Sequence, residues 1–156
     1  MKLLILTAGF LFLPALGQSS LFRVWTYADL ISEADTVVIA IPTDVKESAA
    51  IVPLPGMFTA GGNGNQGPVK SHEVETAFDV RGVLKGNVSI KKFVLHHYSL
   101  DARGLSVISD GPSLVSFEPK DRRSFILFLK KEKGGRFSPV SGQADARRSV
   151  QLLGPP

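Results

Sequence analysis

The chain has 156 residues, a formal net charge of +4 and no cysteine. This length is enough for one domain with a core of its own. The missing thiols exclude disulfides, cysteine nucleophiles and a lipid-modified N-terminal cysteine. Basic and acidic residues are interspersed along the sequence, so the positive charge favours a solvated surface with some attraction for anions.

The first residues have the order of a secretory signal peptide. Lys2 precedes an apolar run, and the small residues Ala15 and Gly17 form a cleavage site at the end of it. The run is shorter than the about 20 residues that a membrane span needs. We therefore expect a signal peptide over residues 1–17, cleaved after Gly17, and a single mature domain over 18–156. We also expect a secreted or periplasmic location and no stable membrane insertion after cleavage.

The next segment predicts a short helix followed by a strand. Thr26 and Asp29 have the spacing of a capping box, at the start of a helix that ends near Asp35. Residues 36–41, TVVIAI, are mostly β-branched and apolar, which favours a strand buried on both faces. Pro42 is expected to end this strand or to mark an edge or a bulge.

Residues 48–71 are rich in Gly, Pro, Asn and Gln, which predicts a long, weakly ordered loop. Positions 62–67 match G-x-G-x-x-G, but a proline and a strand follow where a dinucleotide-binding motif needs a helix. Positions 89–92 match S-x-x-K, but on a strand the serine and the lysine point to opposite faces. We interpret both matches as chance.

The segment 73–84 alternates apolar and charged side chains, which is typical of a strand with one buried face. Phe78 and Val80 are expected inside, and Asp79 and Arg81 outside. Truncation of the buried phenylalanine should then be costly, because buried Phe→Ala changes lose about 3–5 kcal/mol.

A turn at 85–87 is expected to join this strand to a returning strand over 88–98. Gly86 or Asn87 can adopt the positive φ that such a turn requires. The apolar positions change parity along the returning strand, so we expect a bulge near Lys91 and Lys92.

The C-terminal part contains the strongest strand signal, at 124–130. The sequence SFILFLK is apolar on both faces, which favours a central position in the sheet. The glycine pair at 134–135 is expected to turn the chain into a second strand over 136–140. Further short strands are expected at 105–108, 114–117 and 149–153.

One short N-terminal helix and five to seven strands predict an all-β fold. Long, curled strands favour a small Greek-key barrel, of which the five-stranded oligonucleotide/oligosaccharide-binding (OB) type is one solution. A β-sandwich is the alternative.

The three histidines predict no metal or catalytic site. Adjacent residues on a strand point to opposite faces, so His96 and His97 cannot share a metal without a bulge. His72 could lie across the hairpin from one of them, but two histidines without a third ligand make a weak zinc site. We therefore expect no cofactor, no metal ligand and no catalytic residue.

The second hairpin predicts a basic surface. If the chain turns back after 141–146, two further arginines approach the hairpin, and clustered positive charge on loops attracts anions. The candidate partners are an anionic envelope polymer or an acidic protein. The alternative is that these residues only keep an edge hairpin soluble. The candidate binding residues are Lys130, Lys131, Lys133, Arg136, Arg147 and Arg148.

Nucleic acid is not an expected partner. Single-stranded nucleic acid is bound by basic residues interleaved with exposed aromatic ones. Phe125 and Phe128 lie near basic residues in the sequence, but they belong to the strand that we expect to be most buried. Export would also remove the protein from its usual nucleic-acid substrates.

Three stretches together resemble a loosely defined group of exported bacterial proteins of unknown function. They are ADTVVIAIPTDV at 34–45, FDVRGVLKG at 78–86 and RSFILFLKKEKGGRFSPVSGQADARRSV at 123–150. The resemblance implies a barrel of the netrin or tissue-inhibitor-of-metalloproteinase (TIMP-like) OB variety. The chain lacks the inhibitory N-terminal cysteine of true TIMPs, so an inhibitory mechanism of that type is not implied.

These observations favour an exported, non-catalytic binding or interaction module of unknown ligand. Two alternatives remain open. One is a small exported hydrolase whose site is assembled from distant residues, with His96 or His97 as its base. The other is an envelope structural protein.

Overall fold

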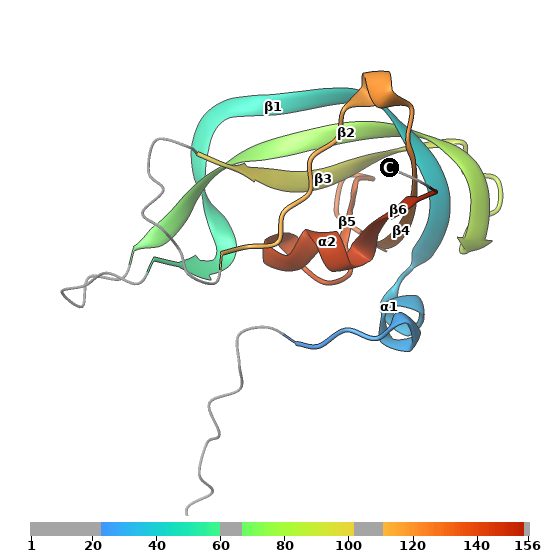
Figure 1. Cartoon of the computed structure of the whole chain (residues 1–156), viewed down its shortest axis with the longest axis horizontal. Coiled ribbons are helices and arrows are strands. Elements are labelled where there is room, and N and C mark those ends of the chain that lie inside the picture. The colour runs from blue at the N-terminus through green and yellow to red at the C-terminus, as the bar shows by residue number, and fades with distance from the viewer. Residues whose placement is uncertain (1–22, 60–66, 102–110, 155–156) are drawn as a thin grey trace, which may run out of the picture.

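The computed structural model describes residues 23–59, 67–101 and 111–154 (Figure 1). The predicted signal peptide over 1–17, residues 62–66 of the glycine-rich motif and the predicted strand at 105–108 lie outside these residues. The elements are α1 Tyr27–Glu33, β1 Thr36–Phe58, β2 Pro68–Lys85, β3 Lys92–Leu100, η2 Pro119–Asp121, β4 Ser124–Lys131, β5 Phe137–Pro139, η3 Gln143–Asp145, α2 Ala146–Ser149 and β6 Val150–Leu153.

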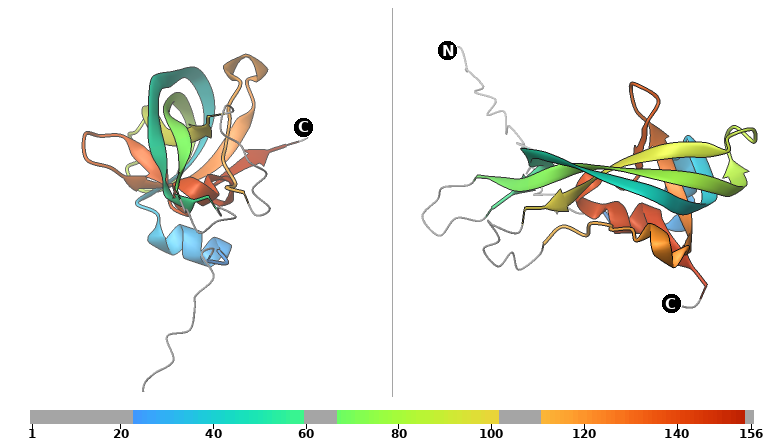
Figure 2. Two further views of the ribbon diagram at one scale, coloured as in Figure 1. Left: turned by 90° about the vertical axis from the view of Figure 1, so that its left-hand side faces the viewer. Right: turned by 90° about the horizontal axis from the view of Figure 1, so that it is seen from above.

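The described strands form one sheet that wraps around itself. Their order is β1-β2-β3-β5-β4-β6, and β1 also pairs with β4, so five strands surround a common core (Figure 2). One side of the ring is narrow, because β3 and β5 share the single registered pair Leu95 and Phe137. The expected all-β, OB-like barrel is confirmed: one sheet encloses the core, whereas a sandwich would have two facing sheets.

The core is a cluster of apolar side chains from all of these strands. Phe78 is 1% exposed and stacks on Phe93, with ring centroids 5.0 Å apart. Val80 packs against the cluster and Arg81 is exposed, so the predicted faces of β2 are confirmed. Burial of each large apolar side chain contributes about 1.5–3 kcal/mol. The buried members are Val38, Ala40, Phe78, Phe93, Leu95, Leu127, Leu129, Phe137 and Val150.

Helix α1 covers the outside of β1 and β4. The predicted capping box is present, because Thr26 and Asp29 exchange backbone and side-chain hydrogen bonds. Leu30 and Ala34, four positions apart, are buried against Phe128 and neighbouring residues. A capped amphipathic turn therefore closes one flank of the barrel.

The loop predicted over 48–71 is much shorter than expected. β1 continues through Pro42 to Phe58, and β2 begins at Pro68, so the two strands form one long curved ribbon (Figure 2). Beyond Ala40, β1 pairs with β2 alone in the described residues, and prolines are tolerated on such an open edge. Irregularities between Pro42 and Asp44, and at four other places, bend the ribbon.

The returning strand starts later than expected, at Lys92. Residues 86–91 form the turn, where Val88 is 76% exposed, so the parity change reflects the turn and not a bulge within a strand. Gly86 has φ +98°, and a Cβ there would lie 2.8 Å from the carbonyl oxygen of Asp35. Glycine is therefore required where this turn passes close to β1.

The C-terminal part agrees with the predicted hairpin and adds short helices. β4 pairs with β1, β5 and β6, so its central position is confirmed. Gly134 and Gly135 both have positive φ, as expected for the turn before β5. Residues 114–117 form no strand, contrary to expectation, and η3 and α2 have no counterpart in the prediction.

Candidate functional site

A cleft of about 680 Å³ opens between two extended stretches of the chain. Residues 113–117 form one wall and β6 the other, and α2 supplies two arginines. Phe125 of β4 adds an aromatic surface to the lining. The volume lies within the range of about 300–1,000 Å³ that is usual for ligand sites. We call this feature the arginine cleft.

The wall at 113–117 is fixed to the fold at both ends. The backbone N–H of Ser113 donates to Ala144 O at 2.8 Å, and the N–H of Arg147 donates to Ser113 O at 3.0 Å. At the other end, the Phe117 ring packs edge-on against Phe78 and Phe125, at centroid distances of 5.0 and 5.2 Å. The cleft is therefore a preformed hollow beside the core.

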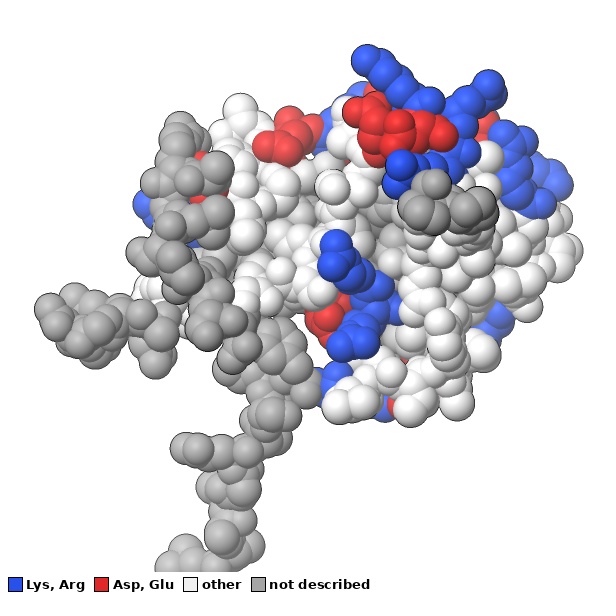
Figure 3. Space-filling model, viewed as in Figure 1, with Lys and Arg blue, Asp and Glu red and all other residues white. Residues whose placement is uncertain are grey.

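The two arginines of α2 are exposed at this cleft. Arg148 Nε lies 3.9 Å from Asp145 Oδ1, a long separation for an ion pair whose arginine side chain is 68% exposed. Burial raises the pKa of Asp145, and the positive charge of Arg148 opposes that rise. Arg147 has no ion pair within the described residues. Figure 3 shows basic side chains over α2 with an acidic one beside them.

The other predicted basic residues lie in different surroundings. Lys130 Nζ lies 3.5 Å from Glu33 Oε2 of α1, and the backbone N–H of Lys131 donates to Asp35. Lys133 is exposed at the hairpin tip. No contact within the described residues joins these side chains to the arginines of α2, so the single enlarged basic surface stays a prediction.

Arg136 is held by two carboxylates. Its NH1 group donates to Glu75 Oε1 at 2.9 Å, and its Nε lies 3.6 Å from Glu132 Oε2. The hydrogen bond to Glu75 is the main reason why the pKa of Arg136 is raised. The guanidinium group of Arg136 is therefore paired within the protein, which makes it a weaker candidate for binding an anionic ligand.

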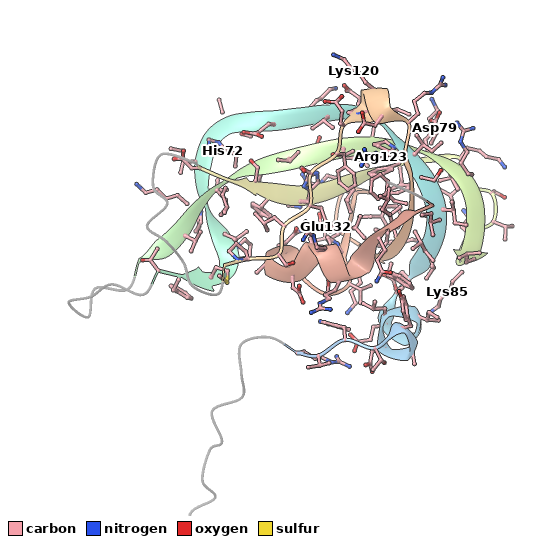
Figure 4. The ribbon with its side chains drawn as sticks, in the orientation of Figure 1. His72, Asp79, Lys85, Lys120, Arg123 and Glu132 are labelled. Carbon is pink, nitrogen blue, oxygen red and sulfur yellow. The ribbon has the colours of Figure 1, made fainter. Side chains whose placement is uncertain are left out.

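Glu132 also contacts His96, at 3.1 Å between Oε2 and Nδ1. A carboxylate only accepts, so Nδ1 carries the proton and Nε2 has none in the neutral ring. His96 Nε2 is buried without a hydrogen bond and lies 3.9 Å from Glu73 Oε1. Figure 4 shows Glu132 in the middle of the molecule, far from His72 at the end of the ribbon. We call this set the His96 network: Glu73, Glu75, His96, Glu132 and Arg136.

The His96 network contains an oriented histidine, which is one of the groups that a hydrolytic site needs. A histidine oriented by a carboxylate through Nδ1 is the arrangement that prepares a general base. However, His96 lines neither the arginine cleft nor a second, smaller cleft of about 220 Å³ beside Trp25. No serine hydroxyl is paired with its Nε2 in the described residues. The hydrolase alternative therefore gains an oriented histidine, but neither of these two clefts includes that residue.

The other two histidines belong to the structure of the barrel. His97 is 2% exposed, its Nε2 lies 2.8 Å from Thr76 Oγ1, and burial lowers its pKa to about 4. His72 lies opposite Ser99, so neither of the other histidines is its cross-strand neighbour. Across residues 23–59, 67–101 and 111–154, no three His, Asp or Glu side chains are arranged to hold a metal ion.

In the part of the chain that the structure describes, no helix combines the length and apolar character needed to cross a bilayer. No protein-family model matches the chain, and no curated protein matches it either.

Proposed function

We propose that this chain is an exported, non-catalytic binding module that takes an anionic ligand in the arginine cleft. The observation that carries the proposal is the state of the two arginines of α2. Arg147 has no counter-charge in the described residues, Arg148 has a distant one, and both line a preformed hollow. Guanidinium groups in such a position favour bidentate hydrogen bonds to carboxylate or phosphate.

The composition of the cleft supports binding over catalysis. Its lining combines aromatic and aliphatic surface with the hydroxyl groups of Ser113 and Ser116, and none of the lining residues is a His, Asp or Glu. General acid–base chemistry needs such a group within hydrogen-bond reach of the ligand. The exposed lining is mostly polar and carries two guanidinium groups, which suits a charged ligand that is held by hydrogen bonds.

Direct binding measurements test the proposal. The mature chain is titrated with poly-L-glutamate and with polyphosphate by fluorescence anisotropy, at low and at high salt. We expect binding to at least one polyanion that weakens as salt rises, because the charges are exposed. Arg147→Glu with Arg148→Glu should abolish it.

The matched control is Lys91→Glu with Lys92→Glu. This adjacent basic pair is also exposed and undergoes the same change of charge, but it lies at the start of β3, where Lys92 Nζ is 3.7 Å from Asp79 Oδ1. Binding that survives in the control and disappears in the cleft variant supports the site. Equal loss of binding in both variants would mean that binding depends on net charge and not on the cleft, which would contradict the proposal. Binding of neither polyanion to the unchanged chain would also contradict it.

A further inference from the structure

β6 is the terminal strand of the sheet. In the described residues it pairs with β4 alone, over Val150–Leu153, and its other edge has no strand partner. The three residues Val150, Gln151 and Leu152 line the arginine cleft. The open edge therefore belongs to the strand that forms one wall of the proposed site.

Leu152 is the residue whose backbone groups can accept a further strand on this edge. The N–H of Val150 donates to Arg147 O and not to β4. In an antiparallel ladder, alternate residues direct their backbone groups to opposite edges. By this alternation, the N–H and C=O groups of Leu152 point away from β4.

β6 lacks the features that protect another open edge of the same sheet. Beyond Ala40, β1 has an open edge in the described residues, and that stretch carries three prolines and exposed charges at Asp44 and Lys46. Prolines and charges on an edge block the addition of a foreign strand. β6 reads VQLL and has neither. Leu152 and Leu153 are each 38% exposed.

We propose that the ligand of the arginine cleft is an extended acidic segment of another protein, which adds to β6 as an antiparallel strand. The inference rests on the proposed function. Arg147 and Arg148 come directly before β6, and an antiparallel partner brings its C-terminal end to this point. The acidic residues, or a terminal carboxylate, therefore lie at the C-terminal end of the bound segment.

The geometry sets the length of the segment. A strand rises about 3.3 Å per residue, so the four residues of β6 pair with a segment of about four residues. One or two further residues reach the guanidinium groups. An anionic polymer without a peptide backbone satisfies the arginines but leaves the edge of β6 unpaired, which is why the acidic peptide is favoured.

Synthetic peptides test the strand pairing. The probe is the labelled peptide Val-Thr-Val-Thr-Glu-Glu, with two variants that carry N-methyl groups on alternate residues. Only every second N–H of an added strand donates to β6. We expect one methylated variant to lose affinity by about tenfold or more and the other to lose less. A peptide with the two glutamates moved to its N-terminal end should bind more weakly.

Two variants of the protein test the same hydrogen bonds from the other side. Leu152→Pro removes the outward N–H, and Leu152→Ala truncates the side chain but keeps that N–H. We expect only the proline variant to lose the peptide, while thermal unfolding confirms that it is folded. If the proline variant does not fold, the methylated peptides decide the question.

The outcomes separate the inference from the proposed function. Equal binding of both methylated peptides, with loss in the Arg147→Glu, Arg148→Glu variant, would overturn strand addition and leave an anion site. Binding of polyphosphate but of no peptide would do the same and identify a polymer as the ligand. Binding of no anionic probe would overturn both.

Discussion

The His96 network and the arginine cleft are both rich in charge, but they use it differently. In the network, Arg136 meets Glu75 and Glu132, and Glu132 also meets His96, so the guanidinium group is paired with carboxylates across β2 and the second hairpin. In the cleft, Arg147 has no ion pair in the described residues. A basic residue is therefore a better candidate for ligand binding where the fold leaves it without a carboxylate partner.

The largest loss of stability is expected for Phe117, which belongs to the wall of the arginine cleft and also packs against the core. Phe117→Ala removes three aromatic contacts, to Phe78, His97 and Phe125. The free energy of unfolding in urea should fall by about 3–4 kcal/mol. Ser116→Ala, an exposed neighbour, should change it by less than about 0.5 kcal/mol. Similar small effects in both would mean that the wall is not anchored in the core.

The buried His97 should make the stability of the fold depend on pH. Burial, and then the neighbouring His96, lower the pKa of His97 from 6.5 to about 4. The unfolded chain therefore binds a proton more readily between these values, and stability falls as the pH falls from 6.5 towards 4. At about 1.4 kcal/mol per pH unit, the loss reaches about 3 kcal/mol.

The control for this prediction is His97→Gln, which cannot be protonated in that range. Urea unfolding of both proteins is compared from pH 7 to pH 4, and the difference between the two curves isolates the histidine. A wild-type curve parallel to that of the variant would show that His97 does not stay neutral in the folded state.

A medium effect should follow from a break in the His96 network. Glu132→Ala leaves Nδ1 of the buried His96 without its acceptor, which should cost about 1–3 kcal/mol of unfolding free energy. Glu132→Gln keeps a carbonyl acceptor and should cost less. Anion binding should be unchanged in both variants, because the network is separate from the cleft. Weakened binding in the glutamine variant would mean that the two sites are coupled.

The smallest effect on stability is expected for the two arginines of α2, because the proposal assigns them to ligand binding. Arg147→Glu with Arg148→Glu breaks only the long, exposed contact to Asp145, so unfolding free energy should change by less than about 1 kcal/mol. The Lys91→Glu, Lys92→Glu control should behave similarly. A large loss of stability in the arginine variant alone would mean that these arginines stabilise α2.

Local patterns in the sequence predict the structure correctly wherever neighbouring residues decide the conformation. The Thr26–Asp29 capping box, the alternation around Phe78 and the glycine turn at 134–135 were all predicted and are present. Each depends on contacts within a few residues or on the alternation of faces along one strand. The all-β class follows from the same signals, because they are numerous and consistent.

The extent of the long ribbon and the position of the cleft depend on contacts between residues that are distant in the sequence. Pro53 and Pro55 predict a loop, yet Pro53 pairs with Lys70 and Phe58 with Pro68, and an open edge tolerates the irregularity between these two pairs. The cleft needs Phe117 beside Phe125 and Ser113 beside Arg147, contacts that no local pattern encodes.

The same distinction holds for charge. The sequence indicates six candidate basic residues, and in the structure they have different neighbours. Lys130 and Arg136 face carboxylates from α1 and β2, which are distant in sequence, whereas Arg147 faces the hollow. Composition therefore determined that the surface is basic, but long-range packing decided which cations are free, because ion pairing depends on distances in space.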